Sequence, residues 1–411
     1  MKRACFLGVA AFALMLFVGC GKEEDETLKV CINDTNRWYM DTLVEGWQEI
    51  EGGLEVEIVE IPTDGESAEL KLSELRTEIM AGEGPDIFVL SCTPPTVDAS
   101  HEDLFRDLGK AMEAGMFLPL DEYISNAKYI DTSGWNQTVL VAGKTEEGQV
   151  VLPLYYYIQA YVYKSSDLSG QELPDSWETL IASDSPIVGN LWAFDFVYSF
   201  ENLADYQTGK LTFTEEVLKA YLEEYCSGLE RVGAQNSETE FPEPIASGNI
   251  TPEFLTQGVG GALEEDQTYL AVPNREGSVT ALVCKFAAIN KNTEKAEEAF
   301  AFLDFMLSDE VTGQKGFTKG EVCYANGVDL DWDLNGITVN QKIFEENYCK
   351  NEKVRTAFEI LNGQIRNARF FSELDSDIYD LCTQYRWTLD SASRDQSVRS
   401  VYETMKMRLA E

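Results

Sequence analysis

The chain has 411 residues, and its 72 acidic side chains against 32 Lys and Arg give a formal net charge of −40 at pH 7. Hydrophobic residues make up 44% and charged residues 25%, which is the composition of a globular chain and excludes a disordered acidic tail. At roughly 100–200 residues per domain, this length favours two domains or lobes. The negative field excludes binding to nucleic acid or anionic headgroups, which requires clustered Lys and Arg. The single histidine, His101, excludes most mechanisms that use imidazole as base or ligand.

The first twenty residues have the layout of a secretory signal. Lys2 and Arg3 precede an apolar run over 4–18, and Gly19 and Cys20 follow. A run of this length is short for a hydrocarbon core of ~30 Å, so a signal is favoured over a membrane span. The letters F-V-G-C resemble a bacterial lipobox, which implies cleavage before a lipidated Cys20, an extracytoplasmic location at the cell membrane and an acidic tether over 20–27. An ordinary secretory signal cut nearby is the alternative. Cleavage before Cys20 removes two positive charges and no acid, so the mature chain carries a net charge of −42.

The cysteines do not form a recognisable framework. Cys5 lies in the signal and Cys20 at the lipidation position, and no C-x-x-C spacing occurs among the rest. We assign no disulfide and expect these dispersed thiols to be buried as small hydrophobic groups, with no metal bound. The remaining seven are Cys31, Cys92, Cys226, Cys284, Cys323, Cys349 and Cys382.

Strand and helix patterns then alternate. Residues 28–33 (LKVCIN) alternate as a strand does, and Leu43, Val44, Trp47 and Ile50 follow at helical spacing. A second strand is predicted over 54–61, a helix with Leu70, Leu75 and Ile79 on one face ends near Gly82, and a third strand covers 86–90. Repeated βαβ units predict a parallel, doubly wound α/β sheet that binds ligands at the carboxyl ends of its strands. The loops after the first and third strands are therefore candidate ligand loops.

Several blocks in order resemble the extracellular solute-binding proteins of ABC importers, family 1. They are I-M-A-G-E-G-P-D-I-F (79–88), F-L-P-L-D-E-Y-I (117–124), V-L-P-L-Y-Y-Y-I-Q-A-Y-V-Y-K-S-S-D-L (151–168), L-P-D-S-W-E-T-L (173–180), A-V-P-N (271–274) and F-A-A-I-N-K-N-T-E-K-A-E-E-A-F-A-F-L-D-F-M-L (286–307). The chain departs from the family pattern at 258–263 (GVGGAL) and at 283–286 (VCKF), near the expected hinge and lobe edge.

The resemblance implies a fold and a function. The fold is a pair of doubly wound α/β lobes joined by a hinge, the type II periplasmic-binding-protein arrangement. The implied N-terminal lobe comprises 28–150 and 285–325, and the C-terminal lobe comprises 151–284 and 326–411. The implied function is to close on a carbohydrate and deliver it to the ABC permease, as a monomer, without catalysis and without a cofactor.

Candidate ligand residues come from strand ends and from composition, because sugar sites pair aromatic platforms with short polar groups. In the loop after the first strand they are Asn36, Arg37, Trp38 and Tyr39, with helix capping and a core position for Trp38 as the alternative. After the third strand they are Ser91 and Cys92, with Thr93 beside them, and an ordinary surface turn is the alternative. Strand alternation should send Tyr155 and Tyr157 to one side and Tyr156 to the other. The remaining candidates are Trp192, Asp266 and Tyr269 in the second lobe, with Asp195 weighed beside them, and Arg369 and Phe370 in a segment that resembles the family's Arg-rich stretch near the cleft.

Residues 331–336 (DWDLNG) match the first half of a calcium loop. Position 12 of such a loop would be Lys342, which cannot supply the bidentate carboxylate that completes the site. We therefore expect a solvated acidic turn that caps the following helix, and no metal site.

Two alternatives to a sugar receptor remain from the sequence. The same fold could bind a peptide, a polyamine or an organic acid. A secreted glycosidase that uses two carboxylates is the enzyme alternative, although nothing among the 72 acids isolates one pair.

Overall fold

The computed structural model describes residues 27–63, 65–92, 103–168, 174–235, 243–257, 266–331, 335–388 and 390–410. The predicted signal, Cys20, most of the tether, Thr93, the segment 258–263 and residues 332–334 lie outside these ranges. Over the described ranges, no helix combines the length and the apolar character needed to cross a membrane.

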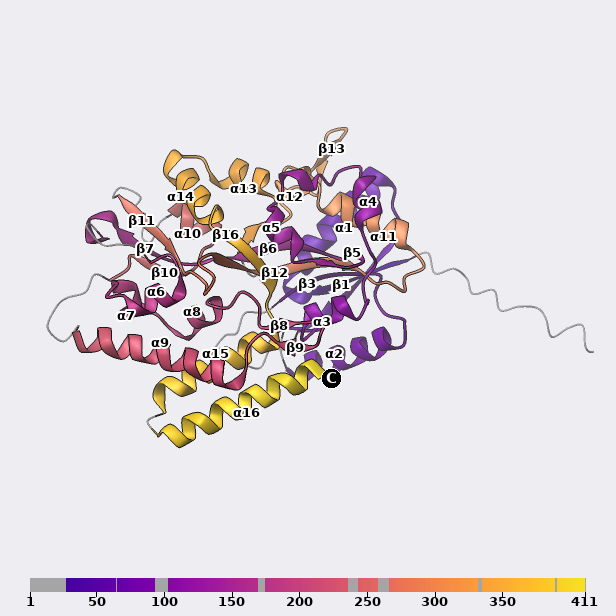
Figure 1. Cartoon of the computed structure of the whole chain (residues 1–411). Helices are drawn as coiled ribbons and strands as arrows, with labels where there is room; N and C mark the ends of the chain where they lie inside the picture. Colours follow the sequence, from indigo (N-terminus) through magenta and orange to yellow (C-terminus); the bar gives the residue numbers. More distant parts are fainter. Residues whose placement is uncertain are drawn as a thin grey trace, which may run out of the picture.

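The N-terminal part of the chain builds the βαβ units that the sequence predicts. Strand β1 (Leu28–Asn33) pairs in parallel with β2 (Val56–Ile61) on one side and with β3 (Ile87–Ser91) on the other. Helix α1 (Arg37–Glu51) connects β1 to β2, and α2 (Gly65–Met80) connects β2 to β3. Figure 1 shows α1 and α11 (Ala296–Met306) on one face of this sheet and α2 and α3 (Leu108–Glu113) on the other. The predicted doubly wound arrangement is confirmed in this lobe.

One detail of α2 differs from the prediction. Leu70 is 66% exposed, whereas Leu72 is buried. The buried face is formed by Ala68, Leu72, Leu75 and Ile79, which recur at helical spacing. Leu70 lies two residues from Ala68, and that separation places it on the opposite side of the helix.

Two long strands connect the lobes. Strand β12 (Val279–Ile289) is buried along its whole length and pairs antiparallel with β6 (Val151–Tyr157). On its other edge, β3 pairs with the second half of β12, over Lys285–Ile289. The first half, over Val279–Val283, pairs in parallel with β16 (Ile365–Phe370). The strand β12 therefore carries elements of both lobes end to end.

The second lobe contains a sheet of three antiparallel strands, in the order β10–β7–β11, within the described residues. Its strands are β7 (Gln159–Lys164), β10 (Ala246–Asn249) and β11 (Gln267–Ala271). In Figure 1 this sheet is surrounded by α6 (Trp177–Ala182), α7 (Pro186–Asn190), α8 (Ala193–Tyr198), α10 (Pro252–Gln257) and α14 (Glu352–Asn362). Below them lie α9 (Glu215–Gln235), α15 (Glu373–Trp387) and α16 (Ser391–Ala410). The C-terminal end of α16 reaches back to the first lobe, where the Lys110 Nζ donates to the Arg408 carbonyl at 3.1 Å.

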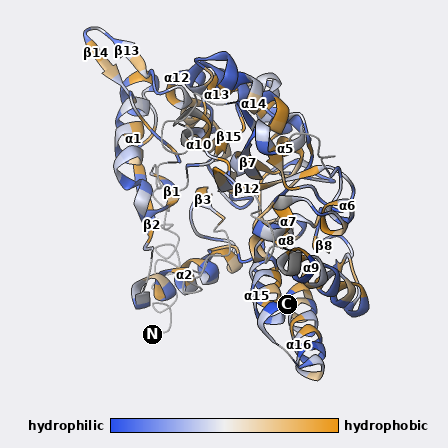
Figure 2. Cartoon of the chain, turned by 90° about the vertical axis from the view of Figure 1, so that its left-hand side faces the viewer, coloured by the Kyte–Doolittle hydropathy of each residue, from blue (hydrophilic) through white to orange (hydrophobic). Residues whose placement is uncertain are grey.

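Short elements complete the chain. Figure 2 shows the hairpin of β13 (Phe317–Lys319) and β14 (Val322–Tyr324) extending beyond the end of α1. The remaining elements are α4 (Asp121–Ser125), α5 (Gln137–Val141), β4 (Lys144–Thr145), β5 (Gly148–Gln149), β8 (Ala204–Asp205), β9 (Lys210–Leu211), α12 (Asp309–Thr312), β13 (Phe317–Lys319), β14 (Val322–Tyr324), β15 (Ile337–Thr338) and α13 (Gln341–Tyr348), with single 3-10 turns over Asp34–Asn36, Thr132–Gly134 and Ser165–Leu168.

The predicted burial of the cysteines is largely confirmed, whereas the predicted exposure of the acidic turn is wrong for Asp331. Six of the seven cysteines in the described residues are buried, as expected, whereas Cys323 on β14 is exposed. The expectation of a solvated turn at 331 is wrong for Asp331, which is only 4% exposed and accepts the Gly336 N–H with its side chain. The following helix, α13, is capped by Asn340, whose side chain accepts the Ile343 N–H.

Candidate functional site between the two lobes

The carboxyl ends of β3 and β16 meet head to head on β12. The Cys92 N–H donates to the Cys284 carbonyl at 2.7 Å, and the Phe371 N–H donates to the Val283 carbonyl at 3.3 Å. These two bonds fix the residue that follows each strand to consecutive positions of β12. Four predicted site residues are thereby brought to one junction between the lobes: Ser91, Cys92, Arg369 and Phe370.

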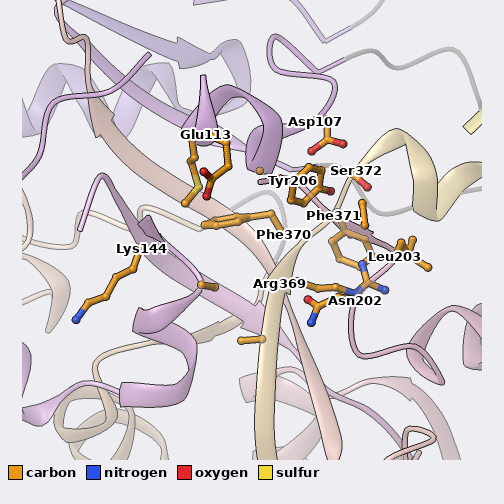
Figure 3. A pocket seen from close by; sticks show the side chains of 15 residues that line it. Asp107, Glu113, Lys144, Asn202, Leu203, Tyr206, Arg369, Phe370, Phe371 and Ser372 are labelled. Carbon is orange, nitrogen blue, oxygen red and sulfur yellow. The ribbon is translucent and has the colours of Figure 1, made fainter. Parts of the chain in front are cut away.

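A cavity of about 220 Å³ opens beside this junction, where Arg369 and Phe370 line it and Ser91 and Cys92 do not. It lies between α3 of the first lobe, β16, and the segment over 202–206 that leads through β8 (Figure 3). The volume is below the roughly 300–1,000 Å³ typical of sites for drug-sized ligands, so the cavity suits one small polar ligand or one ring of a larger one. Its lining includes polar groups from Asp107, Glu113, Lys144, Asn202, Tyr206, Arg369 and Ser372, and apolar groups from Met112, Leu203, Phe370 and Phe371.

Arg369 is held in the wall of this cavity by a buried carboxylate. Its Nη1 lies 2.5 Å from Oδ1 of Asp375, which is fully buried, and its Nη2 donates to the Val197 carbonyl. The other oxygen of Asp375 accepts the N–H and the hydroxyl of Ser372 and so caps α15. The Nε of Arg369 is buried and has no partner among the described residues.

Asp107 and Tyr206 form the opposite wall. The Asp107 carboxylate caps α3 by accepting the Lys110 N–H, and it also bonds the Tyr206 hydroxyl. Burial raises the pKa of Asp107 to about 6, an effect that these hydrogen bonds and the charge of Lys110 only partly oppose. Burial also raises the pKa of Tyr206 well above its ordinary value, so its hydroxyl remains a donor.

A chain of aromatic rings leads from the cavity to the surface. Phe371, in the cavity wall, stacks on Phe194 with ring centroids 6.1 Å apart and contacts Tyr157 edge-on at 6.5 Å. Phe194 in turn lies 5.3 Å from the ring of Trp192, which is 42% exposed. An exposed tryptophan at the end of a buried aromatic row offers a platform for the apolar face of a ligand.

Asp195 positions Trp192 instead of facing a ligand. The fully buried Asp195 carboxylate accepts the Trp192 N–H at 2.8 Å, the Tyr161 hydroxyl at 2.6 Å and the Gln159 side-chain amide at 2.7 Å. Burial raises its pKa to about 7, and these donors only partly oppose the shift. The side chain therefore fixes the start of α8, where Trp192 and Phe194 project.

The loop after β1 places its four predicted residues in different environments. Asn36 is buried, whereas Trp38 is 69% exposed at the start of α1, which excludes the core position for Trp38. Arg37 is engaged by Asp41 at 3.0 Å and by Glu60. Tyr39 is half-buried, with its ring 4.8 Å from that of Trp38, and burial followed by the charge of Asp329 raises its pKa. The exposed Trp38 is the member of this group with a free face.

Tyr155 and Tyr157 have different neighbours. Tyr155 lines a second, narrow cavity with Asp329, Asp331 and Tyr348, and burial raises its pKa well above the ordinary value. Tyr157 contacts Phe371, and the Tyr156 hydroxyl donates to Asn362. The register between β6 and β12 shifts beside Tyr155, where Cys284 and then Leu154 are skipped.

The last two candidates lie away from the junction. Tyr269 pairs with Val162 on β7, and its hydroxyl bonds Gln267 at 3.2 Å. The Asp266 carbonyl accepts the Ser165 N–H, at the end of β7 remote from β6. The structure thus does not bring Asp266 and Tyr269 together with the other candidates.

The sequence did not predict several of the residues that line the cavity. Asp107 could have been found as an N-cap, because R-D-L-G-K has the pattern of a helix start. Phe371 follows the predicted Phe370 directly. Tyr206 and Asn202 lie in or beside a hairpin with no ligand signal of its own. Among the described residues, no group of three or more His, Cys, Asp or Glu side chains could hold a metal ion.

No protein-family model and no curated protein matches the sequence, but the structure resembles many solved ones. A family 1 extracellular solute-binding protein from Alicyclobacillus acidocaldarius aligns with a TM-score of 0.59 and 15% identity, over 94% of this chain and 98% of that one. The sugar-binding protein MalE from Xanthomonas citri gives a TM-score of 0.61 and 12% identity, over 93% and 97%. A periplasmic oligogalacturonide-binding protein from Yersinia enterocolitica gives 0.57 and 12%, over 93% and 99%. The chain therefore has the two-lobed type II fold of these binding proteins, as predicted.

Proposed function

We propose that this protein is the lipid-anchored, extracytoplasmic solute-binding protein of an ABC importer, which closes its two lobes on a carbohydrate and delivers it to the permease. The observation that carries the proposal is the cavity between the lobes, beside the point where β3 and β16 end on β12. Solute-binding proteins of this fold close by a hinge motion, so residues from both lobes must meet at the ligand.

The chemistry of the cavity supports a sugar. Carbohydrates present hydroxyl groups around apolar faces, and the cavity combines the Asp107, Tyr206 and Asn202 side chains with the rings of Phe370 and Phe371. Trp192 extends the aromatic surface outward, which suits a ligand longer than one ring. The proposal assigns binding and transport, with no bond made or broken.

The experiment is thermal unfolding of the chain from Gly21 onward against mono- and oligosaccharides, peptides, polyamines and organic acids. A ligand at about 100 times its Kd stabilises the native state by ~2.7 kcal/mol, which is a shift of several degrees. A shift with one sugar class is expected. Shifts with only cations, peptides or organic acids would keep the fold and overturn the carbohydrate assignment.

Mutations connect the shift to the site. Trp192→Ala should reduce the sugar-induced shift, whereas Trp387→Ala should not, because Trp387 is 74% exposed at the far end of α15 from Ser372. Trp38→Ala tests the predicted loop after β1 in the same assay. Turnover of chromogenic glycosides that disappears on replacing one carboxylate would support the glycosidase alternative.

The anchor is tested separately. Cells that express the full chain should incorporate labelled palmitate, and Cys20→Ala should abolish the label and release the protein from the membrane. Retention of the label in the variant would exclude Cys20 as the lipidated residue.

A further inference from the structure

Helix α3 and the β8–β9 hairpin are in close contact in one wall of the cavity. A Cβ built on Gly109, in α3, would lie 2.4 Å from Cε2 and 2.6 Å from Cδ2 of Tyr206. Real Cβ atoms do not approach a ring so closely, so the Tyr206 ring occupies space that only a glycine at position 109 leaves open. Two residues earlier, at the N-cap of α3, Asp107 bonds the hydroxyl of the same tyrosine.

The two sides of this contact are anchored in different lobes. The segment before α3 packs on the first sheet, where Phe105 lies 5.2 Å from Phe88 of β3 and 5.1 Å from Phe117. Tyr206 follows β8 directly, and β8 pairs with β9 between α8 and α9 of the second lobe. A movement of one lobe against the other must therefore change the contact between Gly109 and Tyr206.

Further bonds lie on the α15 side of the same contact. The Glu373 N–H donates to the Arg106 carbonyl at 3.1 Å, and the side chains of these two residues lie 3.3 Å apart. Together with the bond from Lys110 to the Arg408 carbonyl, they connect the N-terminal half of α3 and the residue before its cap to α15 and α16. The Tyr206 contact differs from these surface bonds because it forms part of the cavity wall.

We propose that Gly109, Asp107 and Tyr206 form a latch that sets the fraction of molecules with closed lobes, and that Tyr206 thereby positions the wall of the ligand cavity. The part of this inference that concerns ligand affinity rests on the proposed function. When only a fraction of the protein is competent to bind, the apparent Kd equals the intrinsic Kd divided by that fraction. A weaker latch therefore reduces the affinity for every ligand by one common factor, whereas a lost ligand contact changes the selectivity.

The first test needs no ligand. Small-angle X-ray scattering of the full mature chain gives the radius of gyration of wild type, Gly109→Ala and Gly233→Ala. Gly233 is the matched control, because it also lies in a helix, α9, and a Cβ there would meet nothing within 4 Å. Gly109→Ala should enlarge the radius of gyration, and Gly233→Ala should leave it unchanged.

A second variant covers the case in which Gly109→Ala fails to fold. Tyr206→Ala removes both the ring contact and the hydroxyl, and it should also give a larger radius of gyration. Tyr402→Ala is its control, because the Tyr402 hydroxyl bonds the Phe213 carbonyl within the second lobe. A wild-type radius in Tyr206→Ala would overturn the latch, as would a wild-type radius in a folded Gly109→Ala.

Binding then separates the latch from the proposed function. For every sugar that binds the wild type, Gly109→Ala should raise the apparent Kd by the same factor. This factor is roughly ten if the fraction of closed molecules falls from nearly one to about one tenth. Unequal factors would overturn the latch and leave the receptor proposal intact. An enlarged radius of gyration with no sugar bound by wild type would support the latch and count against the sugar.

Discussion

The buried pair of Arg369 and Asp375 allows a prediction with a defined magnitude. The Arg369 side chain is 10% exposed and Asp375 is fully buried, with 2.5 Å between Nη1 and Oδ1. Asp375→Ala would leave a buried guanidinium without its carboxylate, which costs about 3–5 kcal/mol. The same change removes the Asp375 half of the capping box at the start of α15, worth a further ~1 kcal/mol. We therefore expect a loss of roughly 4–6 kcal/mol of unfolding free energy.

A double variant separates the charge from the cap. The double variant Arg369→Met, Asp375→Ala no longer contains the unpaired charge, although it still lacks the capping carboxylate. It should therefore be more stable than Asp375→Ala alone by about 2 kcal/mol or more. Glu403→Ala, which breaks an exposed pair with Lys406, should change stability by less than ~0.5 kcal/mol.

The assay is urea unfolding followed by tryptophan fluorescence and by far-UV circular dichroism, since the two lobes could unfold separately. Equal stability of Asp375→Ala and the double variant would refute the reasoning, because it would mean that the isolated guanidinium has no cost. Such a result would also remove the argument that Asp375 holds Arg369 in the cavity wall.

Three further predictions concern single side chains. Burial in the cavity wall raises the pKa of Asp107 to about 6, whereas a carboxyl group that the proposed opening exposes to water should titrate near its ordinary value of 3.8. Ligand affinity should then fall as the pH rises from about 4 through 6, by at most ~3 kcal/mol. Asp107→Asn keeps the cap and should make the affinity measured by titration calorimetry independent of pH in this range. Asp195→Ala should lower the free energy of unfolding in urea more at pH 5 than at pH 8. Because the pKa of Asp195 is raised to about 7 in the native state, the wild type loses the stability that this residue contributes as the pH rises through 7. An equal loss of stability at the two pH values would refute the raised pKa. Gly143→Ala should prevent folding, as judged by circular dichroism, because its Cβ would lie 1.9 Å from the Val151 carbonyl oxygen; a folded variant would show that this loop can move.

The sequence predicted the first lobe well because its strands and helices have clear periods. Residues 28–33 alternate, and α1 buries Met40, Leu43 and Trp47 at helical spacing. Leu70 was assigned to the wrong face because Leu70 and Leu72 stand only two residues apart. The apolar spacing alone did not decide which of them shares the buried face of Leu75 and Ile79. The acidic residue Asp331 was expected in solvent because composition cannot reveal that a carboxylate is buried against the Gly336 N–H.

The site was only partly accessible from the sequence. Strand-end reasoning identified Ser91 and Cys92, and resemblance to a family added Arg369 and Phe370, but their meeting depends on β3 and β16 sharing one edge of β12. That register is a tertiary property. Tyr206 could not be found, because its importance comes from a glycine almost one hundred positions earlier in the chain.

The charge of the cavity supports the proposed neutral ligand, despite the net charge of −40. Its lining contains two acids, Asp107 and Glu113, and two bases, Lys144 and Arg369. Asp375 compensates Arg369, and burial keeps Asp107 partly protonated near pH 6. A polyamine would meet both bases, and an organic acid would meet both acids, so each would bind against a like charge. A neutral sugar meets no like charge and can form hydrogen bonds with both the acidic and the basic side chains of the lining. The balance of charge in the cavity therefore favours the proposed sugar over a cation or an anion, whatever the field of the protein surface does to either ion.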